Sequence, residues 1–248
     1  MDKRTKHPSD EGKRLEAYWI CWDFYFMGTI ILNEDFRNID KKYFEKFNRV
    51  ITITDPPYNQ NYHYSKYSDK LKIEEYINLL SNINYPCIII HYPEESINIL
   101  PKAIRVNCEQ VVSWVYNSNT GKQSRLISWW GCKPDFKKEI QPYKNLKDKR
   151  IQERIKNGKL GAKLYDWWEI NQVKNVSKEK TEHPCQIPIQ LMERIIKITC
   201  NQDDLIFDPF AGSGTTLIAA KNLGYNSLGC EIDEKYFEII KQRIKWQG

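Results

Sequence analysis

Short aliphatic and β-branched runs alternate along the chain with segments whose apolar residues recur at helical spacing. The run Val50–Thr54 has no polar face, which is typical of a central parallel strand buried on both sides. Similar strand-like runs cover 30–32, 87–90, 205–207 and 226–230. Strands that alternate with helical patterns predict an α/β domain with a mostly parallel sheet.

Helices and additional strands are expected between these runs. Gln110–Val115 and Arg125–Trp130 predict two strands that pair antiparallel across a polar turn. Pro188 suits the first position of a helix, and Asp233 can cap the last one. Helices are predicted over 41–47, 73–80, 96–104 with a break at Pro101, 147–156, 188–199, 216–223 and 233–244.

A glycine-rich turn, Asp208–Thr216, separates a strand-like run from a helical one. Glu231 lies 17 residues beyond Gly214, at the end of the next predicted strand, where an acid can hold ribose hydroxyls. Leu217 stands where a dinucleotide fingerprint requires a third glycine, and no Gly-Lys-Ser/Thr P-loop is present. The pattern indicates another nucleoside cofactor, although such a turn alone is also compatible with simple chain reversal.

The central strand runs directly into Asp55-Pro56-Pro57-Tyr58. Proline has no N–H to donate to a sheet, so the two prolines end the strand. Asp55 is therefore expected at the carboxyl end of a central strand, where open α/β sheets bind their ligands. Residues 59–70 predict an exposed loop, whose Tyr62, Tyr64 and Tyr67 either line a pocket or cover the sheet edge.

The composition suits one soluble domain, with 41% hydrophobic and 28% charged residues in 248. Residues 1–16 are mostly polar and expected to be mobile. No run of about 18 apolar residues predicts a membrane span, and 17–32 is interpreted as buried strand material. Seven cysteines without a CxxC pair indicate free thiols in a reducing cytoplasm, and the four histidines form no cluster that predicts a metal site.

The positive charge is concentrated in one segment. Residues 133–180 contain 14 Lys/Arg and 7 Asp/Glu, whereas the formal net charge of the whole chain is +6. A local excess of this kind favours a polyanionic partner. Trp129, Trp130, Trp167 and Trp168 lie in or beside this region and are interpreted as core or interface residues.

Asp55-Pro-Pro-Tyr58 and the Phe-x-Gly-x-Gly turn together resemble the amino-methyltransferases of DNA, which methylate adenine N6 or cytosine N4. His-Pro-x-Gln-x-Pro at 183–188 also matches, and the resemblance covers roughly residues 28–245. The catalytic motif precedes the cofactor motif, as in the family's β class. The resemblance implies a Rossmann-like methyltransferase fold, S-adenosylmethionine as cofactor and double-stranded DNA as partner. It also divides the chain into a catalytic half (17–132), a basic target-recognition insert (133–180) and a cofactor-binding half (181–248).

The resemblance assigns roles to individual residues, with one departure at Ile187, where the family commonly has lysine. The catalytic residues would be Asp55, Pro56, Pro57 and Tyr58. The cofactor would contact Asp35, His183, Asp208, Pro209, Phe210, Ala211, Gly212, Ser213, Gly214, Thr215, Thr216, Glu231 and Ile232. Candidate nucleic-acid contacts are Asn59, Lys133, Lys137, Lys138, Lys147, Lys149, Arg150 and Arg154.

Several alternatives stay open at this stage. Aspartate rather than serine before Pro56 favours adenine N6, with cytosine N4 as the nearest alternative. An RNA amine methyltransferase and a non-catalytic DNA-binding subunit are the others, and a homodimer or a cognate restriction endonuclease partner stays open. Pro184-Cys185-Gln186 resembles the nucleophile motif of cytosine-C5 enzymes but precedes the glycine turn, so Cys185 is interpreted as a small residue beside the cofactor.

Overall fold

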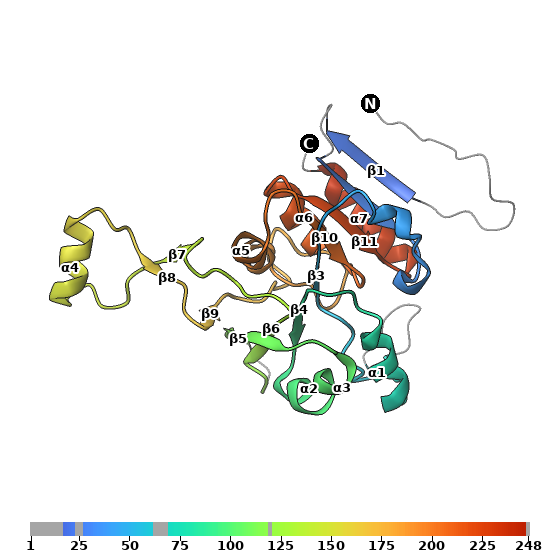
Figure 1. Ribbon diagram of the computed structural model, residues 1–248, viewed down its shortest axis with the longest axis horizontal. Helices are drawn as coiled ribbons and strands as arrows, with labels where there is room; N and C mark the ends of the chain where they lie inside the picture. Colours follow the sequence, from blue (N-terminus) through green and yellow to red (C-terminus); the bar gives the residue numbers. More distant parts are fainter. Residues whose placement is uncertain (1–16, 23–26, 62–68, 119–120, 247–248) are drawn as a thin grey trace, which may run out of the picture.

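The computed structural model describes residues 17–22, 27–61, 69–118 and 121–246 (Figure 1). The predictions made for residues 1–16 and for Tyr62, Tyr64 and Tyr67 concern residues outside the described ones. All further statements concern the described part of the chain.

A mixed sheet of nine described strands forms the centre of the molecule, and five of its eight strand pairs are parallel. The expected mostly parallel α/β architecture is therefore confirmed. In spatial order the strands are β1 (Ala17–Trp22), β2 (Met27–Leu32), β11 (Asn226–Cys230), β10 (Leu205–Asp208), β3 (Val50–Thr54), β4 (Cys87–His91), β6 (Ser124–Trp130), β5 (Cys108–Val115) and β9 (Trp167–Glu169).

Helices cover both faces of the sheet (Figure 1). On one face lie α5 (Ile189–Thr199), α6 (Thr215–Asn222) and α7 (Glu234–Trp246), and on the other α1 (Ile73–Ser81) and α3 (Leu100–Ala103). Successive side chains of a strand point to opposite faces. Accordingly Ile206 packs with the α5 and α6 cluster, whereas Leu205 and Phe207 pack with α1 and α3. The parallel strands are thus buried on both sides, as Val50–Thr54 predicts.

The basic segment is divided between an arm and the sheet. Strands β7 (Ile140–Gln141) and β8 (Ala162–Lys163) pair antiparallel and carry α4 (Lys149–Lys156), which projects away from the body and has no buried residue (Figure 1). The chain then returns as β9 beside β5. There Trp168 is buried against Trp129, with ring centroids 6.1 Å apart. Trp129, Trp130 and Trp168 are core residues, and Trp167 is partly exposed.

Some predicted helices differ in extent. The prediction of a helix over 41–47 is wrong: only the 3-10 turn η2 (Lys41–Tyr43) forms, because Phe44 turns inward to contact Phe207 at a centroid distance of 5.2 Å. The segment 96–104 contains the end of α2 (Pro93–Asn98) and then α3, since Pro101 cannot donate a helical hydrogen bond.

The sequence predicts where α5 and α7 begin, and the structure differs from the prediction only for α5. Pro188 caps α5 from outside rather than occupying its first position, because its ψ of 136° is extended. Asp233 caps α7 as predicted, with its Oδ1 accepting from the Lys235 N–H at 2.9 Å. A further 3-10 turn, η1 (Phe36–Asn38), begins at Asp35.

Gly214 joins the glycine turn to α6 under two constraints. Its φ of +76° is left-handed, and a Cβ at this position would lie 2.8 Å from Ile240 Cγ2 of α7. Gly158, which follows α4 on the arm, has nearly the same φ of +77° but no described atom within 4 Å of an added Cβ. Comparing substitutions at Gly214 and Gly158 therefore separates the free-energy cost of a left-handed backbone from the cost of a steric clash with Ile240.

We expect G214A to lower the free energy of unfolding by at least about 2 kcal/mol, since about 1–2 kcal/mol of left-handed strain adds to about 1–3 kcal/mol of overpacking. The matched change G158A should cost no more than the strain of about 1–2 kcal/mol. Urea unfolding followed by circular dichroism measures both. Equal effects of the two changes would contradict the role assigned to the Ile240 contact.

Candidate active site

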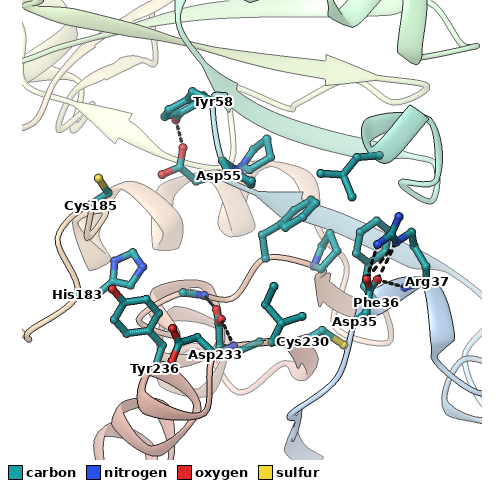
Figure 2. A pocket seen from close by; sticks show the side chains of 18 residues that line it. Asp35, Phe36, Arg37, Asp55, Tyr58, His183, Cys185, Cys230, Asp233 and Tyr236 are labelled. Atoms are coloured by element: carbon teal, nitrogen blue, oxygen red, sulfur yellow. Dashed lines mark hydrogen bonds and ion pairs between the residues drawn. The ribbon is translucent and has the colours of Figure 1, made fainter. Parts of the chain in front are cut away.

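The parallel pair β3–β10 brings the two sequence motifs together. Leu205 aligns with Val50 in this pair, so both strands end at the same sheet edge. The Thr54 hydroxyl donates to Asp208 Oδ1 at 2.8 Å across the strand ends. A cleft of about 290 Å³ opens at this edge and is lined by both Asp55 and Gly212 (Figure 2). The carboxylate and the glycine turn, more than 150 residues apart in sequence, therefore face one cavity.

The predicted cofactor residues divide into three groups. Asp35, His183, Pro209, Phe210, Gly212, Glu231 and Ile232 line the cleft. Asp208, Ala211, Ser213, Thr215 and Thr216 line a smaller neighbouring hollow that also contains His183 and Gly212. Gly214 lines neither and instead fixes the turn against α7.

Glu231 is the buried acceptor of the cleft. Its Oε2 accepts from the Gly212 N–H and its Oε1 from the Asp233 N–H, each at 2.8 Å. Burial raises the pKa of Glu231 to about 7, and these two backbone hydrogen bonds oppose that shift. A carboxylate oxygen with one backbone donor retains acceptor capacity for a hydroxyl group.

An apolar slot completes the cofactor half of the cleft. Phe36 and Phe210 meet edge to face with centroids 5.0 Å apart, and Leu79 and Ile232 also line the cavity. Apolar walls with a few placed polar groups are typical of small-molecule sites. The cleft thus fits the nucleoside part of S-adenosylmethionine: it offers an apolar slot for a flat ring, the Glu231 carboxylate as acceptor for ribose hydroxyls, and the backbone of the glycine-rich turn close by.

Asp35 and Asp208 are both held by protein groups. Asp35 accepts from Arg37 Nε at 2.9 Å and Nη2 at 2.5 Å, and its pKa is lowered chiefly by that hydrogen bonding. Asp208 accepts from the Phe210 N–H at 3.1 Å as well as from Thr54, yet burial raises its pKa to about 6. Asp208 thus braces the ends of β3 and β10 beneath the turn.

His183 borders the cleft opposite Asp35 (Figure 2). Burial lowers its pKa to about 4, with Lys180 and Arg243 acting in the same direction, so the imidazole is neutral at neutral pH. Its ring meets Tyr236 edge to face at 4.5 Å.

Ile187 and Cys185 both lie in the His-Pro-x-Gln-x-Pro segment at 183–188. The buried Ile187 packs in the apolar cluster of α5 and places no charge in the smaller hollow. Cys185 is half-buried and lines both cavities.

The predicted catalytic motif forms the opposite wall of the cleft. Pro56, Pro57 and Tyr58 line it with Asp55. The Tyr58 hydroxyl donates to Asp55 Oδ1, and Arg125 Nη1 lies 3.3 Å from Asp55 Oδ2. Burial raises the pKa of Asp55 to about 7, Arg125 opposes this shift and Asp208 adds to it.

The predicted nucleic-acid residues do not form one surface. Asn59 closes its own loop, because its Oδ1 accepts from the Leu71 N–H at 2.5 Å and its Nδ2 donates to the Leu71 carbonyl at 2.9 Å. Lys133 pairs with Glu109, and Lys138 Nζ donates to the Cys200 carbonyl at 3.1 Å. Of the predicted residues, the arm exposes Lys147, Lys149, Arg150 and Arg154, and Lys137 is exposed near its base.

Sequence reasoning missed Arg125, Tyr92 and Tyr236. Tyr92 packs on Tyr58 with centroids 4.9 Å apart, and Tyr236 lines the cleft. A signal for Arg125 existed: it is the only charged residue in a strand of otherwise apolar or small side chains, β6. Because β6 runs antiparallel to β4, its first residues lie at the edge where the parallel strands end.

No group of three or more His, Cys, Asp or Glu side chains among the described residues is arranged to hold a metal ion. None of the described helices has the length and hydropathy needed to cross a membrane.

Comparison with known proteins identifies the family. The sequence profile of the N6/N4 DNA methylases matches residues 89–242. The type II methyltransferase M.HpaI of Haemophilus parainfluenzae is 28% identical over 211 residues, which cover 78% of this chain and 67% of the relative. M.BglII of Bacillus subtilis is 28% identical over 228 residues, covering 77% and 62%. The chain thus spans about two thirds of these relatives.

Solved structures agree with this result. The complex of M1.HpyAVI with S-adenosylmethionine is 27% identical, covers 86% of this chain and 98% of its own, and superposes with a TM-score of 0.53. The cytosine-N4-specific PvuII methyltransferase covers 87% and 86% with a TM-score of 0.60, and at 15% identity it shows the fold alone. With a match over residues 89–242, this chain belongs to the N6/N4 DNA methylases, enzymes that use S-adenosylmethionine.

Proposed function

We propose that this chain is a site-specific methyltransferase that methylates N6 of adenine in DNA. The observation that carries the proposal is the Asp55 carboxylate, which faces the cofactor turn across one cleft. Within the family, aspartate at the head of this motif is commoner in adenine enzymes and serine in cytosine-N4 enzymes. The named type II relatives favour a role beside a restriction endonuclease.

The proposed methyl transfer depends on two acceptor groups in the cleft wall, the Asp55 carboxylate and the Pro56 carbonyl. An exocyclic amine is a weak nucleophile, because its lone pair is delocalised into the ring. The Asp55 carboxylate and the Pro56 carbonyl can accept its two N–H groups, which favours a tetrahedral nitrogen with a free lone pair. S-adenosylmethionine supplies the methyl group on a sulfonium. A pKa of about 7 lets Asp55 take the amine proton near neutral pH.

Tyr58 provides the face for the base. Its ring lines the cleft and is supported from behind by Tyr92, so a base that has left the duplex can stack on it. Removal of the base from the duplex is necessary because the cleft encloses Asp55, which is itself mostly buried. The proposal therefore includes base flipping.

The product identifies the base. Purified protein incubated with duplex DNA and labelled S-adenosylmethionine should yield N6-methyladenine in the nucleoside digest. N4-methylcytosine as the only product would overturn the adenine assignment, and better transfer to RNA would favour an RNA enzyme. Absence of cofactor binding in calorimetry, with and without DNA, would favour a non-catalytic subunit.

D55N should reduce transfer at least about 100-fold, because it removes the proton acceptor while keeping the side-chain shape. Cofactor affinity should change little, since Glu231 and the glycine turn are untouched. The matched control is D204N, which removes another buried carboxylate that pairs with an arginine, Arg49, at 3.2 Å. D204N should retain transfer; comparable activity of D55N would contradict the proposed role.

The arm is proposed to bind the DNA backbone. Its α4 region carries exposed cations and projects from the edge of the body (Figure 1). Phosphate contacts release counterions, so affinity falls with salt in proportion to their number.

The triple change K147A/K149A/R154A should weaken DNA binding and reduce the slope of log affinity against log salt by up to about 3. The control K41A/K46A/K102A removes three exposed cations from the body. Fluorescence anisotropy at several salt concentrations measures both. Unchanged affinity of the arm variant would show that the arm does not bind DNA.

A further inference from the structure

We propose that Arg125 is a positioning residue for methyl transfer: it holds the Asp55 carboxylate and the Tyr58 ring in their working arrangement. The proposal rests on the proposed function of this cleft. Arg125 does not itself line the cleft, whereas Asp55 and Tyr58 do. It therefore acts through these two side chains.

The topology places Arg125 at the reaction edge. Strand β6 runs antiparallel to β4, and Leu126 aligns with His91, the last residue of β4. The residue before Leu126 thus lies level with the ends of the parallel strands, where Asp55 also lies. Because β6 runs opposite to the parallel strands, the residues at its start lie at the same sheet edge as the residues at their ends.

One nitrogen of Arg125 connects the two catalytic side chains. Nη1 donates to Asp55 Oδ2 at 3.3 Å and to the Tyr58 hydroxyl at 3.2 Å. The Tyr58 hydroxyl in turn donates to Asp55 Oδ1. The three groups form a closed triangle, so movement of any one disturbs both of its hydrogen bonds.

Aromatic rings surround the guanidinium on its other sides. Its central carbon lies 5.1 Å from the Tyr58 ring centroid, 5.2 Å from that of Tyr92 and 5.6 Å from that of Trp114. These distances are within the range of cation–π attraction. Arg125 is only 6% exposed, and a buried cation is stable only when it is paired. The surroundings therefore hold Arg125 in one place, which in turn fixes the Tyr58 ring.

The charges around Asp55 give Arg125 an electrostatic role. The negative charge of Asp208 of β10 raises the pKa of Asp55, and Asp55 in turn raises the pKa of Glu95 of α2. Tyr58 donates to Asp55, Tyr92 packs on Tyr58, and Tyr116, which follows β5, interacts electrostatically with Asp55. Arg125 is the cation that lowers the pKa of Asp55 against burial. Its removal should raise that pKa further.

The sign of the effect on activity follows directly. Asp55 must be ionised to accept a proton, so activity is lost as pH falls through its pKa. In R125M the acidic limb of the kcat profile should move upward by about one pH unit or more, as expected for loss of an adjacent opposite charge. At pH 7 kcat should fall at least about tenfold. The dissociation constant for S-adenosylmethionine, measured by calorimetry, should stay within about twofold of the wild-type value.

The substitution R125K separates the effect of the positive charge at position 125 from the effect of the guanidinium's hydrogen-bond geometry. Lysine keeps the cation but lacks the planar fork that fits between a carboxylate, a hydroxyl and aromatic faces. The acidic limb should therefore return toward the wild-type position, while kcat recovers only in part. If R125M does not fold, R125K and R125Q provide the same comparison.

The control is R49M, which removes the arginine of another ion pair, Arg49–Asp204. Arg49 directly precedes β3 and Asp204 directly precedes β10, so this pair lies at the opposite edge of the sheet. R49M should leave the acidic limb unmoved. An unmoved limb with unchanged kcat in R125M, or an equal shift in R49M, would overturn the role of Arg125. Carbon-13 NMR titration of Asp55 reports the same pKa without turnover. A wild-type protein that transfers no methyl group would instead refute the proposed function, and the titration would still test Arg125.

Discussion

The parallel pairing of β3 with β10 is the constraint on which the site depends. Each strand is short and buried on both faces, and each ends in a polar motif at the same edge. The hydrogen bond from Thr54 to Asp208 locks the two ends together beneath the cleft. Without this pairing, the Asp55 carboxylate and the glycine-rich turn would belong to separate surfaces.

Burial at this edge determines the electrostatics as well. Asp55, Asp208 and Glu231 are three acids from three strand ends, and burial raises the pKa of each. Arg125 and Tyr58 donate to Asp55. Thr54 and the Phe210 N–H donate to Asp208. The N–H groups of Gly212 and Asp233 donate to Glu231. This sheet edge therefore concentrates acceptor groups, and burial disfavours full negative charge on all three of them.

Much of this arrangement was predictable from sequence because it is local. The prolines after Asp55 end a strand, and the glycines after Asp208 permit left-handed backbone, so both motifs could be placed at strand ends. The strand pair across 117–122 and the cap at Asp233 follow from similar rules. Arg125 was not predictable in this way, because its role depends on which strand lies beside β4. The engagement of Asn59 by Leu71 likewise depends on a loop closure that no periodicity reveals.

The two-residue strands β7 and β8 pair only with each other, so among the described residues no strand pairing joins the α4 region to the central sheet. Such a slender attachment means that replacement of the arm would leave the core packing and the cleft intact. A change in the arm would therefore alter what the arm contacts without altering the residues that line the cleft.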